Sequence, residues 1–225
     1  MSRDVSLSIY RTGDYPCPYL PNRMATNLVV AEPVESPALY KALMDSGFRR
    51  SGDTFYKPDC DSCRACVPIR VDADLFRPSD SQRRVARRNA DVEVETGRPQ
   101  CDAERMDVYN RYQSSQHQSS GASEDEYANF LVDSPIDTME MRYRVKGRLV
   151  GVGIVDVCPG ALSSVYFYFD PDFAARSLGV LSALQEIEYC RTHGIQYWYA
   201  GFYVEGCRKM EYKAKFKPNE LIRLA

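Results

Sequence analysis

The sequence predicts an α+β fold built around a mixed β-sheet, and three observations lead to this prediction. First, segments with the apolar pattern of strands alternate along the chain with segments of helical periodicity. Second, Lys146-Gly147 and Pro159-Gly160 supply tight turns between successive strand-like segments. Third, 225 residues with 44% hydrophobic and 27% charged side chains are enough to bury a core, which excludes a disordered or fibrous chain.

The first part of the chain, residues 1–90, is expected to form a small N-terminal α/β domain. Pro37 opens a helix that ends before Gly47, and Ser79 or Ser81 caps the start of a second helix. The expected elements are a strand at 24–31, a helix at 37–46, a hairpin at 48–58 with its turn at Gly52-Asp53, a strand at 66–73 and a helix at 79–89.

The second part, residues 91–225, is expected to form a domain with a mixed sheet and a basic, tyrosine-rich tail. The polar run at 113–123 predicts a mobile loop. The expected elements are a strand at 92–96, helices at 101–112 and 124–132, strands at 138–146, 148–157 and 161–170, a helix from Ser177 to Gly194 and a strand at 195–203. This order, β-α-α-β-β-β-α-β, resembles the GNAT-type N-acyltransferase fold, in which the fourth strand and the following helix hold the acyl donor.

The turn between that strand and helix, residues 167–185, bears on the identity of the donor. Several glycines at a helix N-terminus would let backbone N–H groups surround the pyrophosphate of CoA. Here only Gly179 is present, beside Arg176 and Ser177, so the sequence favours another donor than acetyl-CoA. A CoA-dependent N-acetyltransferase is the alternative, and simple helix capping by Ser177 is the plainer explanation of the turn.

No arrangement for nucleophilic catalysis is evident. The two histidines, His117 and His193, lie in a polar run and at a helix end, and no Ser/His/Asp or Cys/His pattern accompanies them. An aminoacyl ester is already activated, and an α-amine with a pKa of about 7.7–8.0 is partly neutral at pH 7. Bringing ester and amine together can supply on the order of 7–11 kcal/mol, so no covalent enzyme intermediate is expected.

Charge is unevenly distributed although the net charge is only −2. Residues 46–88 hold ten Lys/Arg and six Asp/Glu, and residues 207–223 hold six and two, whereas residues 100–141 hold two and nine. Two basic segments beside an acidic one can steer a polyanion to one face, or form ordinary solvated surface. Aromatic side chains at 166–169 and 197–203 can stack on unpaired bases such as a tRNA acceptor end, or belong to the core.

Three of the eight cysteines are grouped in two overlapping CxxC units, Cys60, Cys63 and Cys66. Thiolates at this spacing suit zinc or an iron–sulfur cluster, and Cys17 is the candidate fourth ligand. Reduced thiols in a loop are the alternative. A metal here would also fit a non-catalytic RNA-binding or metal-sensing protein.

Five stretches, which cover nearly the whole chain in order, resemble the aminoacyl-tRNA–protein transferases, and in particular their bacterial leucyltransferase branch. They are YPCPYLPNRMATNLVV, GFRRSGDTFYKPDCDSCRACVPIRV, YFYFDP, ARSLGVLSALQEIEYCR and YWYAGFYVEGCRKMEYKAKFKPNEL. The single Cys17 in YPCPYL differs from the CxxC-type pair of the similar eukaryotic arginyltransferases.

The resemblance implies that leucine moves from leucyl-tRNA to the α-amine of proteins that begin with Asp or Glu. Such transfer marks proteins for degradation through the N-degron pathway, and it requires neither ATP nor CoA. The resemblance further implies a cytoplasmic enzyme whose partners are leucyl-tRNA and those proteins. We expect no contact with membranes or DNA.

Site residues can be predicted from chemical type. An acidic N-terminal residue needs a cation, for which Arg49, Arg50 and Arg70 are candidates. Tyr168 and Asp170 are the candidates for positioning the amine or relaying its proton. The aminoacyl group and tRNA 3′ end are assigned to Arg176, Ser177, Leu178 and Gly179, and tRNA phosphates to Arg83, Arg84, Arg87, Arg88, Lys209, Lys213, Lys215 and Lys217.

Overall fold

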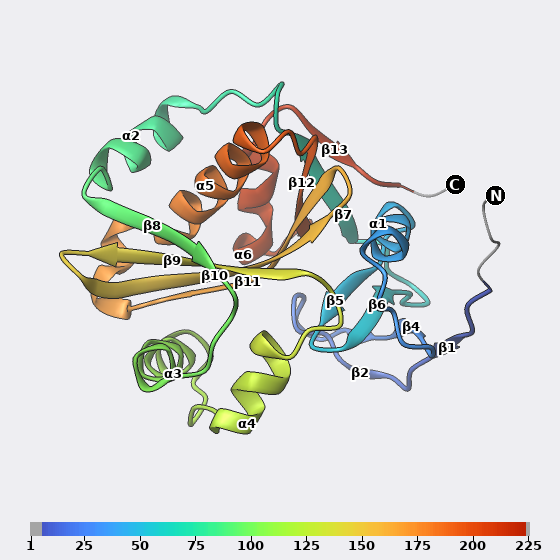
Figure 1. The fold of residues 1–225 in the computed structure, drawn as a ribbon. Helices are drawn as coiled ribbons and strands as arrows, with labels where there is room; N and C mark the ends of the chain where they lie inside the picture. The colour runs from blue at the N-terminus through green and yellow to red at the C-terminus, as the bar shows by residue number, and fades with distance from the viewer. Residues whose placement is uncertain (1–5, 224–225) are drawn as a thin grey trace.

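A computed structural model describes residues 6–223 and is organised around one seven-stranded sheet (Figure 1). The sheet is mixed, because β11 and β12 run parallel while the other neighbouring strands are antiparallel. The strand order is β13 (Asn219–Leu221), β7 (Cys66–Asp72), β12 (Tyr197–Val204), β11 (Ala161–Phe169), β10 (Arg148–Cys158), β9 (Thr138–Val145) and β8 (Val92–Gly97). The predicted α+β class with a mixed sheet is confirmed.

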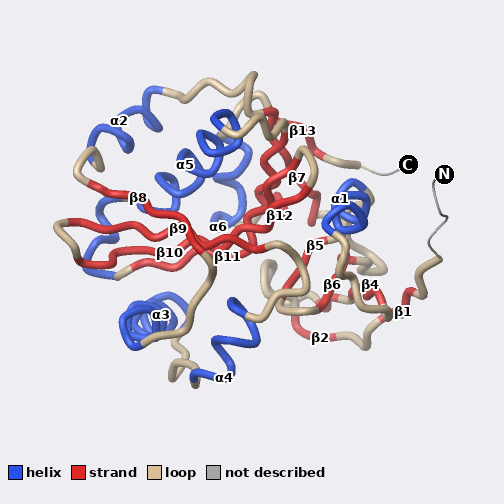
Figure 2. The backbone as a smooth tube through the Cα atoms, in the orientation of Figure 1, coloured by secondary structure: helices blue, strands red, loops and turns tan. Residues whose placement is uncertain are grey.

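Helices cover both faces of this sheet (Figures 1 and 2). On one side lie α5 (Leu178–Thr192), α2 (Asp80–Arg88) and the short α6 (Arg208–Glu211). On the other side lie α3 (Ala103–His117) and α4 (Glu124–Tyr127), which continues as a π-helical turn at Ala128–Val132. Two layers of helices are needed because side chains of the central strands are apolar in both directions, as in Leu149, Val150 and Val152 of β10.

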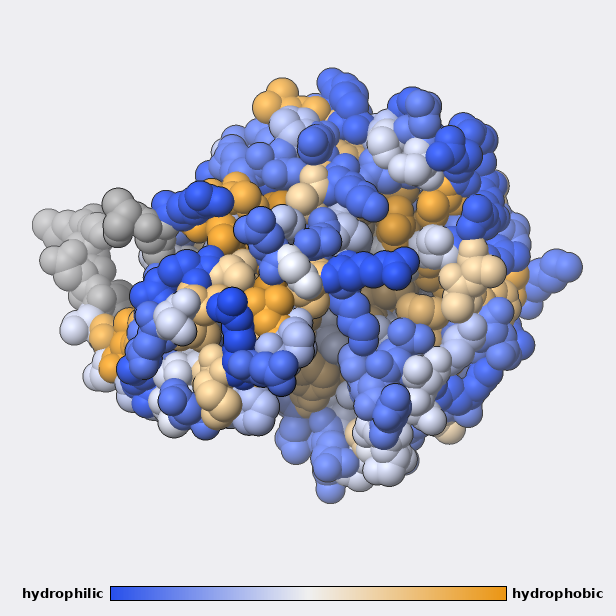
Figure 3. Space-filling view, turned by 180° about the vertical axis from the view of Figure 1, so that it is seen from behind, coloured by the Kyte–Doolittle hydropathy of each residue, from blue (hydrophilic) through white to orange (hydrophobic). Residues whose placement is uncertain are grey.

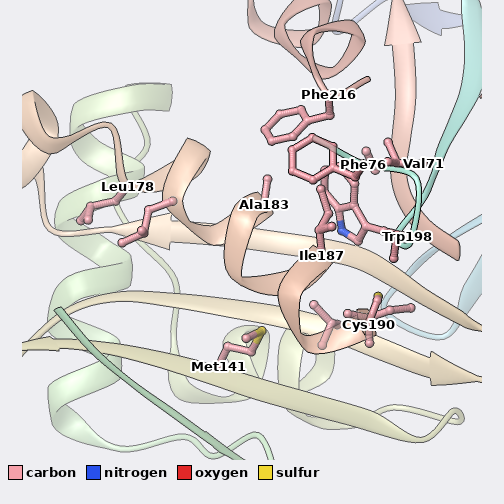
Figure 4. Packing of buried hydrophobic residues seen from close by; sticks show 14 of the residues in the cluster. Val71, Phe76, Met141, Leu178, Ala183, Ile187, Cys190, Trp198 and Phe216 are labelled. Atoms are coloured by element: carbon pink, nitrogen blue, oxygen red, sulfur yellow. The ribbon is translucent and has the colours of Figure 1, made fainter. Parts of the chain in front are cut away.

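The main core fills the space between the sheet and α5 (Figure 4). Leu178, Ala183 and Ile187 of α5 pack with Trp198 of β12 and Met141 of β9. Their burial supplies the hydrophobic free energy that holds the helix against the strands.

A smaller sheet lies beside the large one and has the order β1 (Ile9–Arg11), β4 (Asn27–Val30), β6 (Thr54–Pro58) and β5 (Arg49–Ser51). A short pair, β2 (Tyr15–Pro16) and β3 (Met24–Ala25), and the helix α1 (Pro37–Asp45) complete this region. Tyr40 and Phe55 of this region share one buried cluster with Ala161 and Tyr199 of the large sheet. The two sheets are therefore joined by a continuous core.

Local signals in the sequence explain the ends of several helices. Ser36 accepts a hydrogen bond from the Leu39 amide at the start of α1, and Gly47 takes a positive φ of 90° after its end. Ser79 and Gln82 form a capping box at the start of α2. Ser177, by contrast, makes no side-chain capping bond to α5.

Two segments differ from the expected elements. Helix α3 continues to His117, so the first residues of the predicted loop at 113–123 are helical. Contacts made by that last turn explain the extension, because the Gln113 side chain donates a hydrogen bond of 2.9 Å to the Tyr166 hydroxyl. The tail also contains β13, which no sequence pattern indicated and which pairs with β7 at Asn219 and Val71.

The predicted division into domains 1–90 and 91–225 does not coincide with the two sheets. Strand β7 lies before residue 90, yet it is an inner strand of the large sheet, between β12 and β13. Helix α2 also lies before residue 90 and contacts α5. Whether the two parts fold as separate units stays a prediction.

Across residues 6–223, no helix is both long enough and apolar enough to cross a membrane. Figure 3 shows one face of the molecule, on which hydrophilic side chains predominate and apolar ones lie in smaller groups between them.

Candidate active site

A cavity of about 740 Å³ opens where β11 and β12 separate. The two strands pair only from Ala161 to Ser163 and from Tyr197 to Tyr199, although they continue to Phe169 and Val204. Side chains from both strands line the cavity beyond the last pair, together with the start of α5, the end of α3, and the segment from Cys207 to Lys213. Because no strand pairing crosses this gap, backbone N–H groups of the separated strands are available to a ligand oxygen.

Aromatic side chains form much of the cavity wall. They include Tyr112 from α3, which packs edge-on against Phe169 with ring centroids 5.1 Å apart. Rings of this kind can stack on a nucleobase. The aromatic residues of the wall are Tyr19, Tyr40, Tyr56, Tyr112, Tyr166, Phe167, Phe169, Trp198, Phe202 and Tyr212.

Glu186 is a buried carboxylate at the cavity, with 3% of its surface exposed. It accepts hydrogen bonds from the Ser182 hydroxyl at 2.8 Å, from the Trp198 indole N–H at 2.7 Å and from the Ser164 hydroxyl. Burial raises the pKa of Glu186. These bonds join α5 to both separated strands and so fix the shape of the opening.

Arg49 of β5 reaches the same cavity and has 4% of its surface exposed. Its Nη1 donates to the carbonyls of Phe48 at 2.6 Å and Met44 at 3.3 Å, and its guanidinium lies over the rings of Tyr199 and Phe202. Its Nε has no hydrogen-bond partner, and the guanidinium forms no ion pair with any residue between 6 and 223. Burial lowers the pKa of Arg49, but an arginine stays charged in proteins.

Lys213 lies close to Arg49, on the 3₁₀ turn Tyr212–Lys215. A Cβ at Gly201, whose φ is +86°, would come within 3.2 Å of the Lys213 Nζ. Only glycine fits this position well, because the backbone is left-handed and the amine occupies the space of a side chain. Burial, with a smaller effect of the Arg49 charge, lowers the pKa of Lys213 to about 8.

Of the three arginines predicted to meet an acidic acceptor, only Arg49 has a guanidinium without a carboxylate partner in the described chain. Arg50 lines the cavity, but it makes a bidentate ion pair with buried Asp156 at 2.6 and 2.8 Å. Arg70 pairs with Asp45 at 3.2 Å and Glu220 at 2.7 Å and lies outside the cavity wall. Of these three arginines, Arg50 and Arg70 are therefore neutralised by carboxylates, whereas Arg49 is not.

The predicted pair Tyr168 and Asp170 does not reach the cavity. Tyr168 is fully buried on the α3 side, with its hydroxyl 2.6 Å from that of Tyr127. Asp170 is 1% exposed and pairs with Arg111 at 2.9 Å and with Arg148. Phe167 and Phe169 line the cavity instead, from the face of β11 opposite to Tyr168, because side chains alternate along a strand. Tyr166 packs in the same cluster as Tyr168 but also lines the cavity, where β11 and β12 have separated.

The turn before α5 meets the cavity in part. Ser177, Leu178 and Gly179 line it, and Ser177 has the left-handed φ of 58°. Arg176 points elsewhere and pairs with Asp91 at 2.7 Å. The N-terminus of α5 therefore faces the cavity without a charged side chain from this turn.

The two predicted basic segments meet in the structure. Gln82 of α2 donates a hydrogen bond of 3.3 Å to the Lys215 carbonyl, and the Arg77 amide donates one of 3.3 Å to the Lys217 carbonyl. This places the arginines of α2 beside the basic tail, and Lys209 and Lys213 of the tail line the cavity.

The phosphate candidates on α2 differ in their contacts. Arg84 and Arg87 are exposed and form no ion pair within residues 6–223, whereas Arg83 pairs with Asp80 at 2.5 Å. Arg88 donates a hydrogen bond of 2.6 Å to the Ala175 carbonyl. Lys209, Lys215 and Lys217 are exposed.

The cysteine loop does not fit the predicted zinc or iron–sulfur site. Cys17, Cys60, Cys63 and Cys66 are free thiols and partly buried. Nowhere in residues 6–223 do three or more His, Cys, Asp or Glu side chains lie close enough together to hold a metal ion. Burial, followed by the charges of the neighbouring thiols, raises the pKa of Cys66 to about 12.

Sequence reasoning missed Glu186 as a member of the site and missed the position of His117 on the cavity wall. The signal for Glu186 was present, since it is a lone carboxylate on the otherwise apolar face of α5 next to Ala183 and Ile187. His117 carried no such signal, because α3 was expected to end before it.

Comparison with known proteins gives consistent results. The family described as "Arginine-tRNA-protein transferase, C terminus" matches residues 104–223, and its N-terminal counterpart matches residues 15–84. An aspartate/glutamate leucyltransferase of Stenotrophomonas maltophilia (strain K279a) is 40% identical over 229 residues, which cover 97% of this chain and 91% of that protein. One from Pseudomonas aeruginosa (strain PAO1) is 38% identical over 226 residues, with 98% and 96% covered.

Solved structures of similar fold are more distant in sequence. FemX has a TM-score of 0.52 at 8% identity, with 88% of this chain and 70% of FemX covered. L-PGS from Bacillus licheniformis has a TM-score of 0.51 at 14% identity, with 79% and 60% covered. Because the identities are this low, the two matches bear on the fold alone. The shared fold agrees with the predicted GNAT-like architecture.

Proposed function

Because the chain belongs to the arginine-tRNA-protein transferase family, we propose that it transfers leucine from leucyl-tRNA to the α-amine of proteins that begin with Asp or Glu. In this reaction the amine nitrogen attacks the ester carbonyl, a C–N bond forms, and the C–O bond to the ribose of the tRNA breaks. The relatives that share 38–40% identity over nearly the whole chain carry the name of this activity.

The observation that carries the proposal is Arg49 at the wall of the cavity. Its guanidinium is buried and has no carboxylate partner among residues 6–223, so a ligand carboxylate in the cavity would stabilise its charge. The side-chain carboxylate of an N-terminal Asp or Glu is such a ligand, and charge-assisted bonds of this kind are among the strong ones. Arg49 would therefore select acidic acceptors.

The donor fits the remainder of the cavity. The separated strands can offer N–H groups to the ester oxygen, and the aromatic wall can stack on the terminal adenine of the tRNA. Leu178 and Gly179, at the start of α5, would line the space for the leucyl side chain. Exposed Arg84 and Arg87, together with the lysines of the tail, would contact tRNA phosphates.

The proposed reaction requires no cofactor, because the aminoacyl ester already carries the free energy that amide formation needs. Orientation of the two substrates in one cavity supplies on the order of 7–11 kcal/mol of the barrier. We propose a cytoplasmic location, where charged tRNA is available, and a place in the N-degron pathway of protein degradation.

Transfer of labelled leucine tests the proposal directly. Purified protein is mixed with labelled leucyl-tRNA and with three peptides that differ only in an N-terminal Asp, Glu or Ala. We expect label on the first two peptides and none on the third. Equal labelling of all three would contradict the acceptor rule, and acetylation from acetyl-CoA without leucyl transfer would replace the proposal by the CoA-dependent alternative.

A further inference from the structure

We propose that Lys213 accepts the proton that the acceptor α-amine loses when leucine is transferred. This inference rests on the proposed function and adds a proton acceptor, which neither Tyr168 nor Asp170 supplies at the cavity. Three observations support the inference: the position of the Lys213 amine, the charged groups that face it, and the hydrogen bonds that already occupy the other titratable groups nearby.

Lys213 places its amine at the cavity that is proposed to hold both substrates. The side chain lines the cavity between the separated strands, and its Nζ lies against Gly201 of β12. Within residues 6–223 the amine makes no hydrogen bond and no ion pair, unlike Lys41, which pairs with Asp45 at 2.6 Å. An amine without a carboxylate partner can bind substrate and exchange a proton with it.

Burial and the charge of Arg49 favour the neutral form of Lys213. The groups that face it are Arg49 from β5, which acts against the ammonium charge, and Glu186 from α5 and Cys207 before α6, which act weakly in favour of that charge. Burial has the largest effect, and the pKa of Lys213 falls to about 8. A free α-amine has nearly the same pKa, about 7.7–8.0, so the proton can pass between the two nitrogens with little change in free energy.

Other candidates at the cavity are less suitable. Both carboxylate oxygens of Glu186 already accept hydrogen bonds, which hold the strands and α5 together. The Tyr166 hydroxyl accepts a bond from Gln113, and burial raises the pKa of Tyr166 above its usual value. His117 lies on the exposed end of α3.

The neutral form of the acceptor α-amine attacks the ester carbonyl and forms the C–N bond, and neutral Lys213 takes one proton from the attacking nitrogen. As the C–O bond to the ribose breaks, the Lys213 ammonium donates a proton to the leaving ribose oxygen. The products are the amide and the free 3′ end of the tRNA, and Lys213 is again neutral.

Two substitutions separate proton transfer from the effect of charge. Lys213→Arg keeps a cation that cannot lose its proton, and Lys213→Met keeps the length of the side chain without an amine. We expect both to slow amide formation by about 100-fold or more in single turnovers with bound leucyl-tRNA and saturating Glu-peptide. The peptide KM should change by less than about threefold, since the acidic side chain is held by Arg49.

Lys146→Met serves as the matched control, because Lys146 lies in the β9–β10 turn, away from the cavity. It should transfer leucine at the wild-type rate. If Lys213→Arg also retained that rate, or if it raised the peptide KM with an unchanged rate constant, Lys213 would be a binding cation and the inference would be wrong.

The titration of Lys213 is measured on the free protein with ¹³C-labelled lysine, which is practicable because the chain has only seven lysines. We expect one of the seven lysines to titrate with a pKa of about 8, and we expect its signal to be absent from the Lys213→Arg variant. Seven lysines that all titrate near about 10.4 would overturn the inference independently of any substrate. Wild-type protein that transfers no leucine would instead overturn the proposed function, and this inference with it.

Discussion

At the residue scale, the site depends on which charges remain unpaired. Arg49, Arg50 and Arg70 are chemically alike, yet Asp156 neutralises Arg50 and Glu220 neutralises Arg70. Arg49 is left with backbone carbonyls and two aromatic rings as its neighbours. A guanidinium in this setting is prepared for a ligand carboxylate, because its desolvation has already occurred on folding.

The first prediction concerns Arg49. Arg49→Met should lower kcat/KM for Asp- and Glu-peptides by about 10- to 100-fold, since a hydrogen bond to a charged group contributes about 1.5–3 kcal/mol. Steady-state transfer of leucine to matched peptides measures this effect. Arg191→Met is the control, because Arg191 lies at the end of α5 and, within residues 6–223, pairs with exposed Glu188 alone. Unchanged kcat/KM in Arg49→Met would remove Arg49 from acceptor recognition.

At the scale of elements, the hairpin of β5 and β6 is tied to the large sheet by one buried ion pair. Arg50 of β5 and Asp156 of β10 are both almost fully buried, and Thr138 of β9 donates a further hydrogen bond of 2.6 Å to Asp156. The pair orients β5 so that Arg49, the preceding residue, meets β12 and the cavity. Arg50 therefore acts on the site through the position of the strand.

The second prediction follows from this pair. Arg50→Met should lower the free energy of unfolding by about 3–5 kcal/mol, because it leaves the Asp156 carboxylate buried without its partner. Urea denaturation followed by circular dichroism measures the change. The double variant Arg50→Met, Asp156→Leu should recover part of the loss, since no charge then remains buried. A single variant as stable as the wild type would show that the pair does not hold the hairpin.

At the scale of the whole molecule, two basic segments that are far apart in the sequence lie side by side. The hydrogen bond between Gln82 and Lys215 brings α2 against the tail, beside the cavity that Lys209 and Lys213 line. A net charge of −2 is compatible with the proposed binding of tRNA, because the local field of the basic side chains would steer a polyanion.

The third prediction addresses the exposed arginines of α2. The double variant Arg84→Glu, Arg87→Glu should weaken tRNA binding and reduce the slope of log K against log salt by about two units, since each phosphate contact contributes nearly one. Filter binding of tRNA at several salt concentrations measures the slope. The double variant Arg98→Glu, Arg191→Glu makes the same change of charge outside α2 and the basic tail, and it should leave the slope near its wild-type value. An unaltered slope in the α2 variant would exclude α2 from the tRNA contact.

Much of the fold was predictable because its signals are local. Alternating apolar residues, the turns at Gly147 and Gly160, and the capping residues Ser36 and Ser79 specify the elements through contacts within a few residues. The exceptions are equally instructive. Strand β13 and the last turn of α3 form only because β7 and Tyr166 offer partners from elsewhere in the chain.

The site was predictable in type more than in detail. The carboxylate of Glu186 on α5 and the basic residues near the C-terminus are visible in the sequence. The proton-relay role, however, was assigned to Tyr168, which is buried on the other side of the sheet. Alternation along β11 is known from sequence, whereas the face that meets the cavity depends on where β12 separates from it.

The sequence by itself determined the class of fold, the order of elements from residue 91 to residue 204, and membership in a transferase family, since these depend on local patterns and on residues in a fixed order. Only the tertiary structure decided which cations are available for chemistry. The partner of Arg50 lies 106 residues away and the neighbours of Lys213 come from β5, β12 and α5, so their charges are known only when the chain is folded.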